Sequence, residues 1–389
     1  MTREEFDTLR LPEVQAALAA AAGRDPLAVA LDARVPHARL VATQLKYRER
    51  ARHKLPAFAA AGAIFPPRAF EQASGEACAL LKRPQGETVL DLTCGLGVDA
   101  WALSRRFGRV TTLERDPVLA EVAAWNFRRL GCTNIEVVCA SAEEYLQREG
   151  LRFDWIYADP DRRDGAGRRR IRLGDCSPDM EALLPAVRRV AGGLCVKCSP
   201  MFDVAEAFRI FGRCRVEAVS WRDECKEVLV CADGSEPQIA AVAIGADGSE
   251  TRFSAPWPVE EPAAPPAFDP AAYRWLVQPD VALRKSRTTR RHLAGRADCW
   301  SNDGYGFAAE PPTGVMGRIM EIDRIEPYDP RTLKRSLRQE LPDGRAEILK
   351  RDFPLATAEI ARRIGVTEGG SRRIAFTKIG GKLWTIRLK

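Results

Sequence analysis

Short apolar runs alternate with segments of helical periodicity over residues 88–211. Apolar runs of about four to six residues predict buried strands, whereas apolar residues spaced three and four apart predict helices that cover a sheet. Strands that alternate with helices form a parallel sheet with helices on both faces. The chain is therefore predicted to be an α/β protein with a doubly wound sheet. Strands are expected at 89–92, 109–113, 135–140, 153–158 and 193–198, and helices near 98–107, 117–130, 142–148, 178–191 and 203–211.

The segments on either side of this region have different patterns. Residues 1–70 are predicted to be helical, because apolar residues such as Leu11, Val14 and Leu18 recur at helical spacing. Ser74 is expected to be the N-cap of a short helix that leads into the first strand. Further strands at 215–221, 224–231 and 239–244 are expected to complete the sheet.

Six prolines between Pro256 and Pro270 predict a semi-stiff linker. Beyond this linker the pattern predicts small mixed α/β units, with strands at 318–325, 346–350, 373–378 and 383–388 and a helix at 355–364. The predicted parts are an N-terminal helical region at 1–70, the sheet domain at 71–255, the linker at 256–270, a small piece at 271–315 and a C-terminal domain at 316–389.

The first predicted strand ends in the glycine-containing loop Asp91–Gly97. Glycine allows a sharp turn and lets the backbone lie against a ligand. The loop lacks the G-x-G-x-x-G pattern of dinucleotide-binding proteins, and its initial carboxylate suits a ligand with a positive or amino end. Glu114, at the tip of the second strand, is placed to accept hydrogen bonds from both ribose hydroxyls. Together the two acids point to S-adenosylmethionine; a purely structural turn is the alternative.

Other candidates for cofactor binding lie at the same edge of the predicted sheet. Ser141 and Ala142 follow the third strand, where an acid would often hold the adenine amino group. Gln72 and Glu71 precede the first strand and are candidates for the methionine end. The full set of predicted cofactor-binding residues is Asp91, Thr93, Cys94, Gly95, Gly97, Glu114, Ser141, Ala142, Asp159 and Gln72.

The segment Asp159–Arg163, which follows the fourth predicted strand, is the expected reaction site. Ligands and chemistry in open α/β sheets gather at the carboxyl ends of the strands. Asp159 would orient the acceptor or take its proton, and Asp161 is a second candidate base. Arg162 and Arg163 would hold flanking phosphates or a base edge, with a salt bridge inside the loop as the alternative.

Charge is distributed unevenly along the chain. Residues 271–389 hold 24 Lys and Arg against 14 Asp and Glu, whereas residues 1–270 hold 36 against 39. The loop 164–172 is also rich in arginine. Basic surfaces of this kind favour a phosphate-rich partner such as RNA; an ordinary solvated surface is the alternative.

The remaining composition argues against several classes of protein. No apolar run is long enough to span a membrane and residues 1–10 lack a signal-peptide core, so cytoplasmic residence is expected. The 11 cysteines are scattered through predicted strands and helices, which argues against a disulfide framework. Only 3 histidines are present, and no metal site is expected. The oligomeric state is left open.

Several motifs together make the chain similar to a bacterial family of class I methyltransferases that carry a THUMP-like C-terminal domain. The resemblance covers nearly the whole length and implies a Rossmann-like catalytic domain, a small ferredoxin-like piece and a THUMP-like domain. Because THUMP domains are associated with RNA-modifying enzymes, it also implies an RNA substrate, tRNA or rRNA. The motifs are Lys54–Pro56, Glu71–Ser74, Asp91–Asp99, Asp159–Arg163, Lys197–Pro200, Glu224–Glu227, Gly317–Arg318 and Arg351–Pro354.

Two departures from related RNA enzymes bear on the function. Asp161 and Arg162 replace a proline and an aromatic residue typical of enzymes that methylate amines, which disfavours amino-nitrogen methylation. Ser141 replaces an acid. Direct methyl transfer is the preferred mechanism, with a covalent route through Cys198 as its rival. A non-catalytic RNA-binding protein is a rival function for the whole chain, and so is a methyltransferase that acts on small molecules or proteins.

Overall fold

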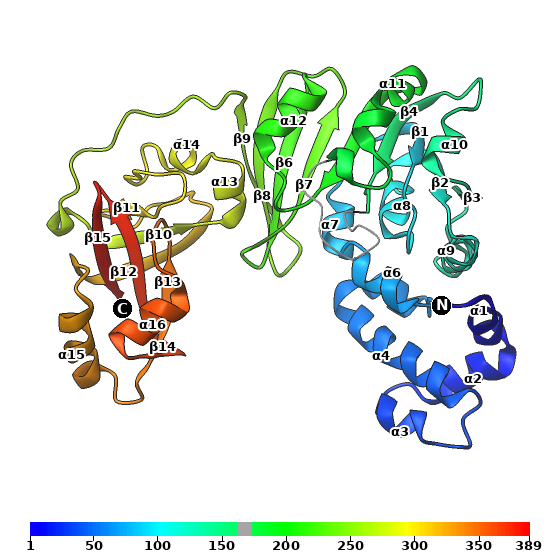
Figure 1. Ribbon diagram of the computed structural model, residues 1–389, viewed down its shortest axis with the longest axis horizontal. Helices are drawn as coiled ribbons and strands as arrows, with labels where there is room; N and C mark the ends of the chain where they lie inside the picture. The colour runs from blue at the N-terminus through cyan, green and yellow to red at the C-terminus, as the bar shows by residue number, and fades with distance from the viewer. Residues whose placement is uncertain (162–172) are drawn as a thin grey trace. The chain divides into compact units, whose positions relative to one another are not determined.

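The computed structural model of the chain describes residues 1–161 and 173–389, which divide into two compact units (Figure 1). The first unit comprises Met1–Cys214 and Val228–Ser235, and the second comprises Arg215–Glu227 and Glu236–Lys389. The predicted catalytic residues Arg162 and Arg163, and the basic loop 164–172, lie outside the described residues.

A parallel sheet forms the centre of the first unit, as predicted. Its strands lie in the order β3-β2-β1-β4-β5, and β7 pairs antiparallel with β5. Strands β1 to β3 follow one another toward one edge of the sheet, and β4 and β5 follow toward the other edge. The strand order therefore reverses between β1 and β4, and ligands bind at this point in doubly wound folds. The strands are β1 (Gly86–Asp91), β2 (Phe107–Glu114), β3 (Ile135–Cys139), β4 (Phe153–Ala158), β5 (Ala191–Cys198) and β7 (Glu224–Ala232), of which β7 belongs to the first unit from Val228 onward.

Helices connect the parallel strands, and aspartates fix where several of them begin. Asp116 accepts hydrogen bonds from the first-turn amides of α9, and Asp179 and Asp203 do the same for α11 and α12. A carboxylate at an N-cap satisfies amides that have no partner inside the helix. The helices are α8 (Val98–Leu103), α9 (Pro117–Arg129), α10 (Ala142–Tyr145), α11 (Met180–Val190) and α12 (Val204–Phe211), with a 3₁₀ turn at Leu173–Asp175.

The predicted helical N-terminal region is confirmed, and it shares its cores with the sheet domain. One core joins Phe6 to Val122 of α9, and a second joins Phe65 to Trp101 and Phe127. These apolar side chains are buried together, so the hydrophobic effect stabilises both parts at once. The helices are α1 (Arg3–Arg10), α2 (Pro12–Ala20), α3 (Pro26–Ala30), α4 (Ala38–Lys54), α5 (Pro56–Ala60), α6 (Pro67–Gln72) and α7 (Glu76–Leu80).

Two fully buried amide side chains hold the segment that leads out of these helices. Gln44 of α4 exchanges hydrogen bonds of 2.9 and 3.1 Å with the backbone of Phe65. Asn126 of α9 does the same with Ile64, at 2.8 and 2.9 Å. Buried backbone groups need such partners where no strand neighbours them.

The second unit contains two groups of strands. In the first group β6 (Arg215–Trp221) pairs parallel with β8 (Gln238–Ile244), which pairs antiparallel with β9 (Glu250–Pro256). The second group is a six-stranded sheet in the order β11-β10-β12-β15-β14-β13. Its elements are β10 (Trp275–Pro279), α13 (Val281–Lys285), α14 (Thr289–Leu293), β11 (Gly306–Ala308), β12 (Gly317–Pro327), α15 (Pro330–Glu340), β13 (Arg345–Lys350), α16 (Thr357–Ile364), β14 (Thr367–Ile379) and β15 (Lys382–Leu388).

The boundaries between the parts of this second unit stay a prediction. Strands from both sides of residue 316 lie in one sheet, because β10 pairs with β12.

The proline-rich segment carries no helix or strand between Pro256 and the 3₁₀ turn at Pro270–Ala272. Two side chains nevertheless bind it: Arg290 donates to the Glu261 carboxylate and Trp300 donates to the Pro266 carbonyl.

Candidate functional site

Asp91, the last residue of β1, holds the following loop through hydrogen bonds to its carboxylate. Its carboxylate is buried and accepts hydrogen bonds from the Thr93 amide at 3.0 Å and the Thr112 hydroxyl at 2.6 Å. Burial raises the pKa of Asp91 to about 7, although these hydrogen bonds oppose the rise. Both carboxylate oxygens are engaged with the protein, so the structure shows Asp91 shaping the loop; its direct contact with a cofactor stays a prediction.

The two glycines of the loop differ in what surrounds them. Both have left-handed backbones, with φ of 56° at Gly95 and 88° at Gly97. A side chain at Gly97 would place its Cβ 2.5 Å from the Phe127 ring, whereas a Cβ at Gly95 would meet no atom within 4 Å. The loop is therefore closed against α9 at Gly97 and open at Gly95, where a ligand could approach the backbone.

Glu114 lies beside the open part of the loop. Its carboxylate accepts from the amides of Gly95 and Asp116, both at 2.9 Å. Burial raises the pKa of this half-buried carboxyl group. A carboxylate offers about four lone-pair sites, so two remain for ribose hydroxyls. The bare backbone at Gly95 and the spare acceptors of Glu114 together fit the nucleoside of S-adenosylmethionine.

Other predicted cofactor residues have roles of their own in the fold, and their cofactor contacts stay predictions. The Ser141 hydroxyl caps α10 by accepting from the Glu144 amide at 3.2 Å, and Ala142 is buried in the same helix. The thiol of Cys94 is buried, and Gln72 is exposed at the end of α6.

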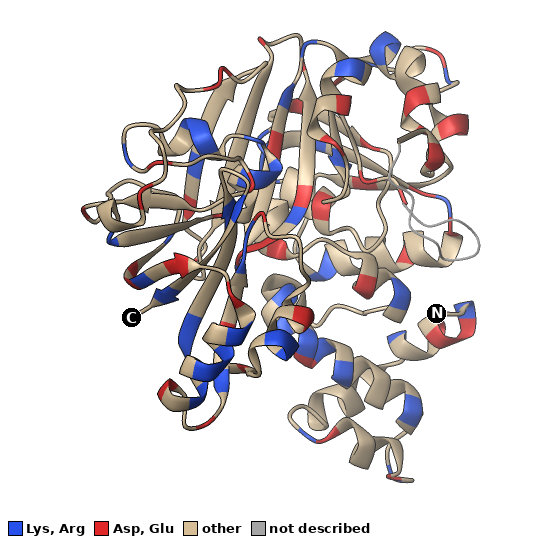
Figure 2. Ribbon diagram, turned by 60° about the vertical axis from the view of Figure 1, so that its left-hand side comes forward, with Lys and Arg blue, Asp and Glu red and all other residues tan. Residues whose placement is uncertain are grey.

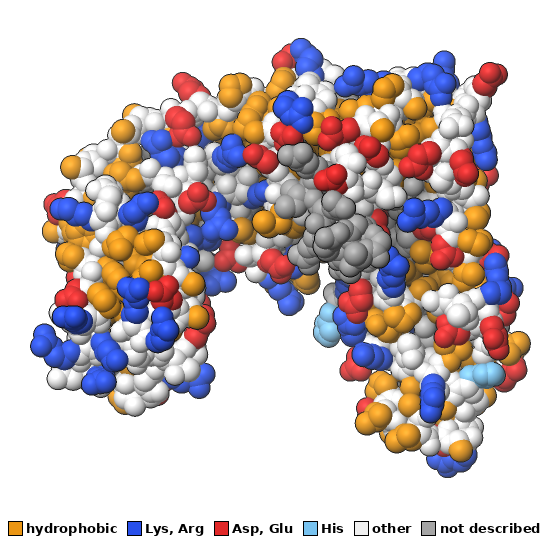
Figure 3. All heavy atoms as spheres, in the orientation of Figure 1, with side chains coloured by type: hydrophobic (Ala, Val, Ile, Leu, Met, Phe, Trp, Pro, Cys, Tyr) orange, Lys and Arg blue, Asp and Glu red, His pale blue; other side chains and the backbone are white. Residues whose placement is uncertain are grey.

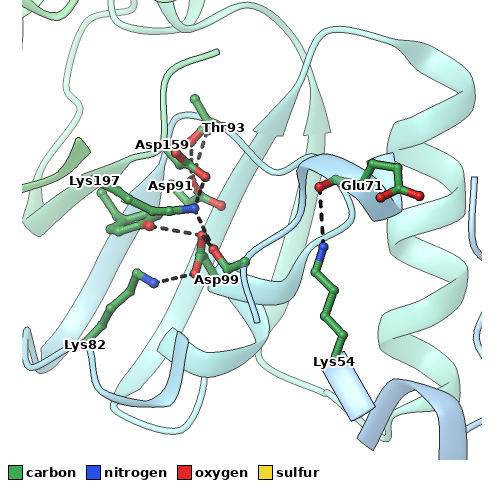
Figure 4. A network of polar contacts seen from close by, with 10 residues as sticks. Lys54, Glu71, Lys82, Asp91, Thr93, Asp99, Asp159 and Lys197 are labelled. Atoms are coloured by element: carbon green, nitrogen blue, oxygen red, sulfur yellow. Dashed lines mark hydrogen bonds and ion pairs between the residues drawn. The ribbon is translucent and has the colours of Figure 1, made fainter. Parts of the chain in front are cut away.

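A buried polar network joins the carboxyl ends of β4 and β5 to the segment before β1 (Figure 4). The Lys197 ammonium donates to the Asp159 carboxylate at 2.5 Å and to the Ser74 hydroxyl at 2.7 Å. Ser74 donates in turn to Asp99 at 2.9 Å. Asp99 also pairs with Lys82 at 2.6 Å and accepts from the Tyr157 hydroxyl at 3.0 Å.

Charges within this network compensate one another. Burial alone would raise the pKa of Asp99, but the ammonium groups of Lys82 and Lys197 outweigh it and hold the pKa below its ordinary value. Two carboxylates thus face two ammonium groups in a region largely closed to water. Buried ions require this pairing because each alone would cost on the order of several kcal/mol of desolvation.

Most of this network was not predicted from the sequence, and the role of Ser74 was predicted wrongly. Helix α7 begins at Glu76 with Gly75 as its N-cap, so the predicted capping role of Ser74 is wrong. The serine hydroxyl is instead held between Asp99 and Lys197. A lysine inside the apolar run 194–198 was the available signal, because a lysine in a buried strand needs a partner.

Asp159 and Asp161 lie in different surroundings. The Asp159 amide donates to the Thr93 hydroxyl at 2.6 Å, which ties the end of β4 to the cofactor loop. Asp161 exchanges backbone hydrogen bonds with Ser177, and its carboxylate lies 3.8 Å from the Arg68 guanidinium. The structure therefore brings Asp159, but not Asp161, into contact with Lys197.

A second lysine lies beside the segment before β1. The Lys54 ammonium, at the end of α4, donates to the Phe70 carbonyl at 2.6 Å. It also donates to the Glu71 carbonyl at 3.4 Å (Figure 4). Burial lowers the pKa of Lys54 to about 8. The Glu71 carboxylate pairs with Arg50, so this candidate for the methionine end already has a partner in the fold.

Replacing Asp91 by asparagine is expected to change how stability depends on pH. The pKa of Asp91 in the folded chain is about 7, above its ordinary value of 3.8, so the folded state holds this proton more tightly. Relative to Asp91→Asn, the wild type should lose up to about 1.4 kcal/mol of stability per pH unit as pH rises from about 4 to about 7. Urea unfolding of both proteins at several pH values measures this, and parallel curves would contradict it.

In residues 1–161 and 173–389, no group of three or more His, Cys, Asp or Glu side chains could hold a metal ion. None of the helices in the same ranges is both long and apolar enough to cross a membrane.

Comparisons with known proteins agree with this geometry. A family model described as a methyltransferase domain matches residues 89–161, and one described as THUMP domain-like matches residues 317–389. An uncharacterized S-adenosylmethionine-dependent methyltransferase of Mycobacterium tuberculosis is 27% identical over 326 residues, covering 82% of this chain and 85% of the relative. Ribosomal RNA small subunit methyltransferase J of Tolumonas auensis is 31% identical over 156 residues, covering 34% of this chain and 61% of that protein.

A solved structure shows the same fold over the full length. A crystal structure from Porphyromonas gingivalis W83 superposes with a TM-score of 0.81 at 24% identity, covering 100% of this chain and 99% of the other. The sheet order, the open glycine loop and Glu114 fit the cofactor that the methyltransferase relatives use. The chain is a class I S-adenosylmethionine-dependent methyltransferase with a THUMP-like C-terminal domain.

Proposed function

We propose that this enzyme transfers the methyl group directly to RNA, either tRNA or rRNA. The observation that carries the proposal is an exposed row of arginines on α15 of the THUMP-like domain, at Arg331, Arg335 and Arg338. The three side chains repeat at helical spacing, and none forms an ion pair with a described residue. Leu333 and Leu337 are buried on the same helix. Unpaired cations on one helix face suit a phosphate backbone.

Charge elsewhere supports the same partner. Figure 3 shows lysine and arginine side chains gathered over α15 and α16, and Figure 2 shows their distribution along the ribbon. Arg362 of α16 and Arg372 of β14 are exposed as well. The relative from Tolumonas auensis is named as a ribosomal RNA methyltransferase, and the THUMP-like match is to a domain type associated with RNA modification.

The residues of the site suggest how the acceptor is handled. S-adenosylmethionine, when bound, supplies an electrophilic methyl group on a positively charged sulfur. The backbone at Gly95 and the carboxylate of Glu114 would hold it. Asp159 would orient the acceptor through the carboxylate oxygen that Lys197 does not engage, since that oxygen makes no hydrogen bond to a described residue.

The protein is expected to lower the barrier to methyl transfer mainly by holding the two reactants close together and in the right orientation. Holding two reactants in line can supply roughly 7–11 kcal/mol of a barrier. The acceptor's lone pair forms the new bond to carbon, the electrons of the carbon–sulfur bond remain on sulfur, and the acceptor proton passes to Asp159 or to water. The rival route through Cys198 has less support, because that thiol is buried at the end of β5.

Removing the arginines of α15 is expected to weaken RNA binding in a salt-dependent way. With Arg331, Arg335 and Arg338 all changed to serine, the slope of log affinity against log salt should fall by about 2–3, because each lost phosphate contact removes about 0.7–0.9. Filter binding of total RNA at several salt concentrations measures the slope. The matched control changes three exposed arginines of the first unit, Arg128, Arg148 and Arg188, to serine. Equal slopes for the two variants would contradict the proposed interface.

The decisive test of RNA as substrate is nucleoside mass spectrometry. Total RNA from a strain that lacks the gene should be missing one methylated nucleoside that its parent contains, and the purified enzyme should restore it in vitro. Identical nucleoside profiles, together with no transfer to RNA from the deletion strain, would overturn the proposal.

A further inference from the structure

Lys197 connects the proposed acceptor site to the buried network. Its side chain is 6% exposed, although it lies near the carboxyl end of β5 where ligands bind. Its ammonium donates to Asp159 of the β4 end and to Ser74 of the segment before β1. A single side chain thus ties three separate segments together beside the expected reaction centre.

We propose that Lys197 is a positioning residue for methyl transfer, which acts by holding the Asp159 carboxylate in one orientation. The inference rests on the proposed function, since it assigns Asp159 to the acceptor. Lys197 donates to the Oδ2 oxygen of Asp159 at 2.5 Å, and Oδ1 makes no hydrogen bond to a described residue. The acceptor would then bind to the Oδ1 oxygen of Asp159, whose position is fixed by the ion pair with Lys197.

Asp159 is fixed at two points, its backbone amide and its side chain. The Thr93 hydroxyl accepts from its amide at 2.6 Å, and Thr93 donates in turn to Asp91. The backbone is therefore tied to the floor of the cofactor loop, while Lys197 ties the side chain to Ser74. Fixing both ends removes the rotamer freedom that an aspartate beside solvent otherwise has.

Asp99 has other partners besides Lys197, so neutralising Asp99 is not a sufficient reason for Lys197 to be buried here. Asp99 already has Lys82 at 2.6 Å and the hydroxyls of Ser74 and Tyr157 at 2.9 and 3.0 Å. A further buried ammonium costs desolvation that its ion pair offsets only when geometry is excellent, so a buried salt bridge is weak evidence for a role in stability. Precise placement of the reacting groups is the benefit that remains, because an error of about 1 Å can lower a rate by about 10²-fold.

The primary test compares Lys197→Met with Lys82→Met. Both changes remove a buried ammonium that pairs with a carboxylate, but Lys82 pairs with Asp99 where Lys197 pairs with Asp159. Lys197→Met should lower kcat by about 10²-fold, and its KM for RNA and its affinity for S-adenosylhomocysteine should change by less than about threefold, within the ordinary spread of such measurements. Lys82→Met should lose as much melting temperature with a much smaller loss of kcat. Equal losses of kcat in the two variants would overturn the proposal.

A double-mutant cycle keeps the test valid if Lys197→Met folds poorly. Asp159→Asn combined with Lys197→Met leaves neither charge unpaired, so it should fold better than Lys197→Met alone. If Lys197 acts through Asp159, adding Lys197→Met to Asp159→Asn should lower kcat by less than about threefold. A full further loss of about 10²-fold would show that Lys197 acts by another route. Lys197→Arg keeps the charge but not the geometry, and it should recover folding without recovering kcat.

The choice of acceptor separates this inference from the proposed function. Wild-type enzyme is assayed first with RNA from the deletion strain and then with nuclease-treated extract of the same strain. Transfer to RNA supports the proposed function, and the Lys197 comparison is then made with RNA as the acceptor. Transfer only to the nuclease-treated extract overturns RNA as substrate, and the Lys197 comparison continues with that acceptor. Absence of transfer to either overturns both.

Discussion

Changing Asp159 to alanine is expected to lower methyl transfer by roughly 10²–10⁴-fold, the range that one positioned acid or base contributes. Asp159 is the carboxylate that the structure places at the end of β4, with one oxygen paired to Lys197. Binding of S-adenosylhomocysteine should change little, because the Thr93 amide and the Thr112 hydroxyl still donate to Asp91 and hold the cofactor loop. Transfer of a labelled methyl group and calorimetry with S-adenosylhomocysteine measure the two effects.

Two controls separate chemistry from stability in this experiment. Asp159→Asn retains the shape of the side chain and should still lose most of the rate. Asp161→Asn removes the other candidate base, whose carboxylate lies 3.8 Å from Arg68 and outside the buried network. It should lose less than about tenfold, an order of magnitude below the usual effect of a catalytic acid or base. Full transfer by Asp159→Ala would remove Asp159 from the mechanism.

Changing Gly97 to alanine is expected mainly to destabilise the fold, whereas changing Gly95 to alanine is expected mainly to weaken cofactor binding. Gly97→Ala would require an alanine to adopt the left-handed backbone that Gly97 has, and it would place a methyl group 2.5 Å from the Phe127 ring. Backbone strain of about 1–2 kcal/mol and overpacking of about 1–3 kcal/mol predict a loss of about 2–5 kcal/mol in the free energy of unfolding. Gly95→Ala carries only the backbone strain, because its methyl group would meet no atom within 4 Å.

Cofactor binding is where Gly95→Ala should differ from wild type. Its methyl group would occupy the open space over the loop, so affinity for S-adenosylmethionine should fall by at least about tenfold, or about 1.4 kcal/mol. Thermal unfolding and calorimetry on both variants measure the two quantities. Unchanged affinity in Gly95→Ala would place the cofactor elsewhere, and an unchanged melting temperature in Gly97→Ala would contradict the contact with Phe127.

Local sequence patterns were sufficient to predict the central sheet. Strands β1 to β5 each contain a short apolar stretch, such as Val89–Leu90 in β1 and Leu194–Val196 in β5, and such a stretch can be recognised as a strand from the local sequence alone. Six helices and strands of the second unit were missed: β9, β10, β11, α13, α14 and α15. For two of them the reason is a weak pattern. Edge strand β9 carries few apolar residues, and helix α15 shows only a narrow apolar stripe of Leu333, Leu337 and Leu341 among polar residues.

The network around Lys197 could not be predicted from local patterns. Ser74, Lys82, Asp99 and Lys197 are separated by up to 123 residues in the sequence and meet only after the sheet has formed. Asp99 in the first turn of α8 has the pattern of an ordinary acidic residue at a helix start. The place of Glu114 at the ligand-binding edge could be predicted because it follows from the end of a strand, and its contact with ribose stays a prediction.

The buried side-chain amides of Gln44 and Asn126 limit how far the protein can be shortened from its N-terminus. A fragment that began at residue 71 would retain Asn126 but lose Ile64, and a fully buried amide would be left without either of its partners. The same cut would strip Phe65 from Phe127 and expose apolar surface of α9 to water. Any trimmed version made for crystallisation or ligand screening should therefore retain the first 70 residues, whose removal would take part of the catalytic domain's interior with them.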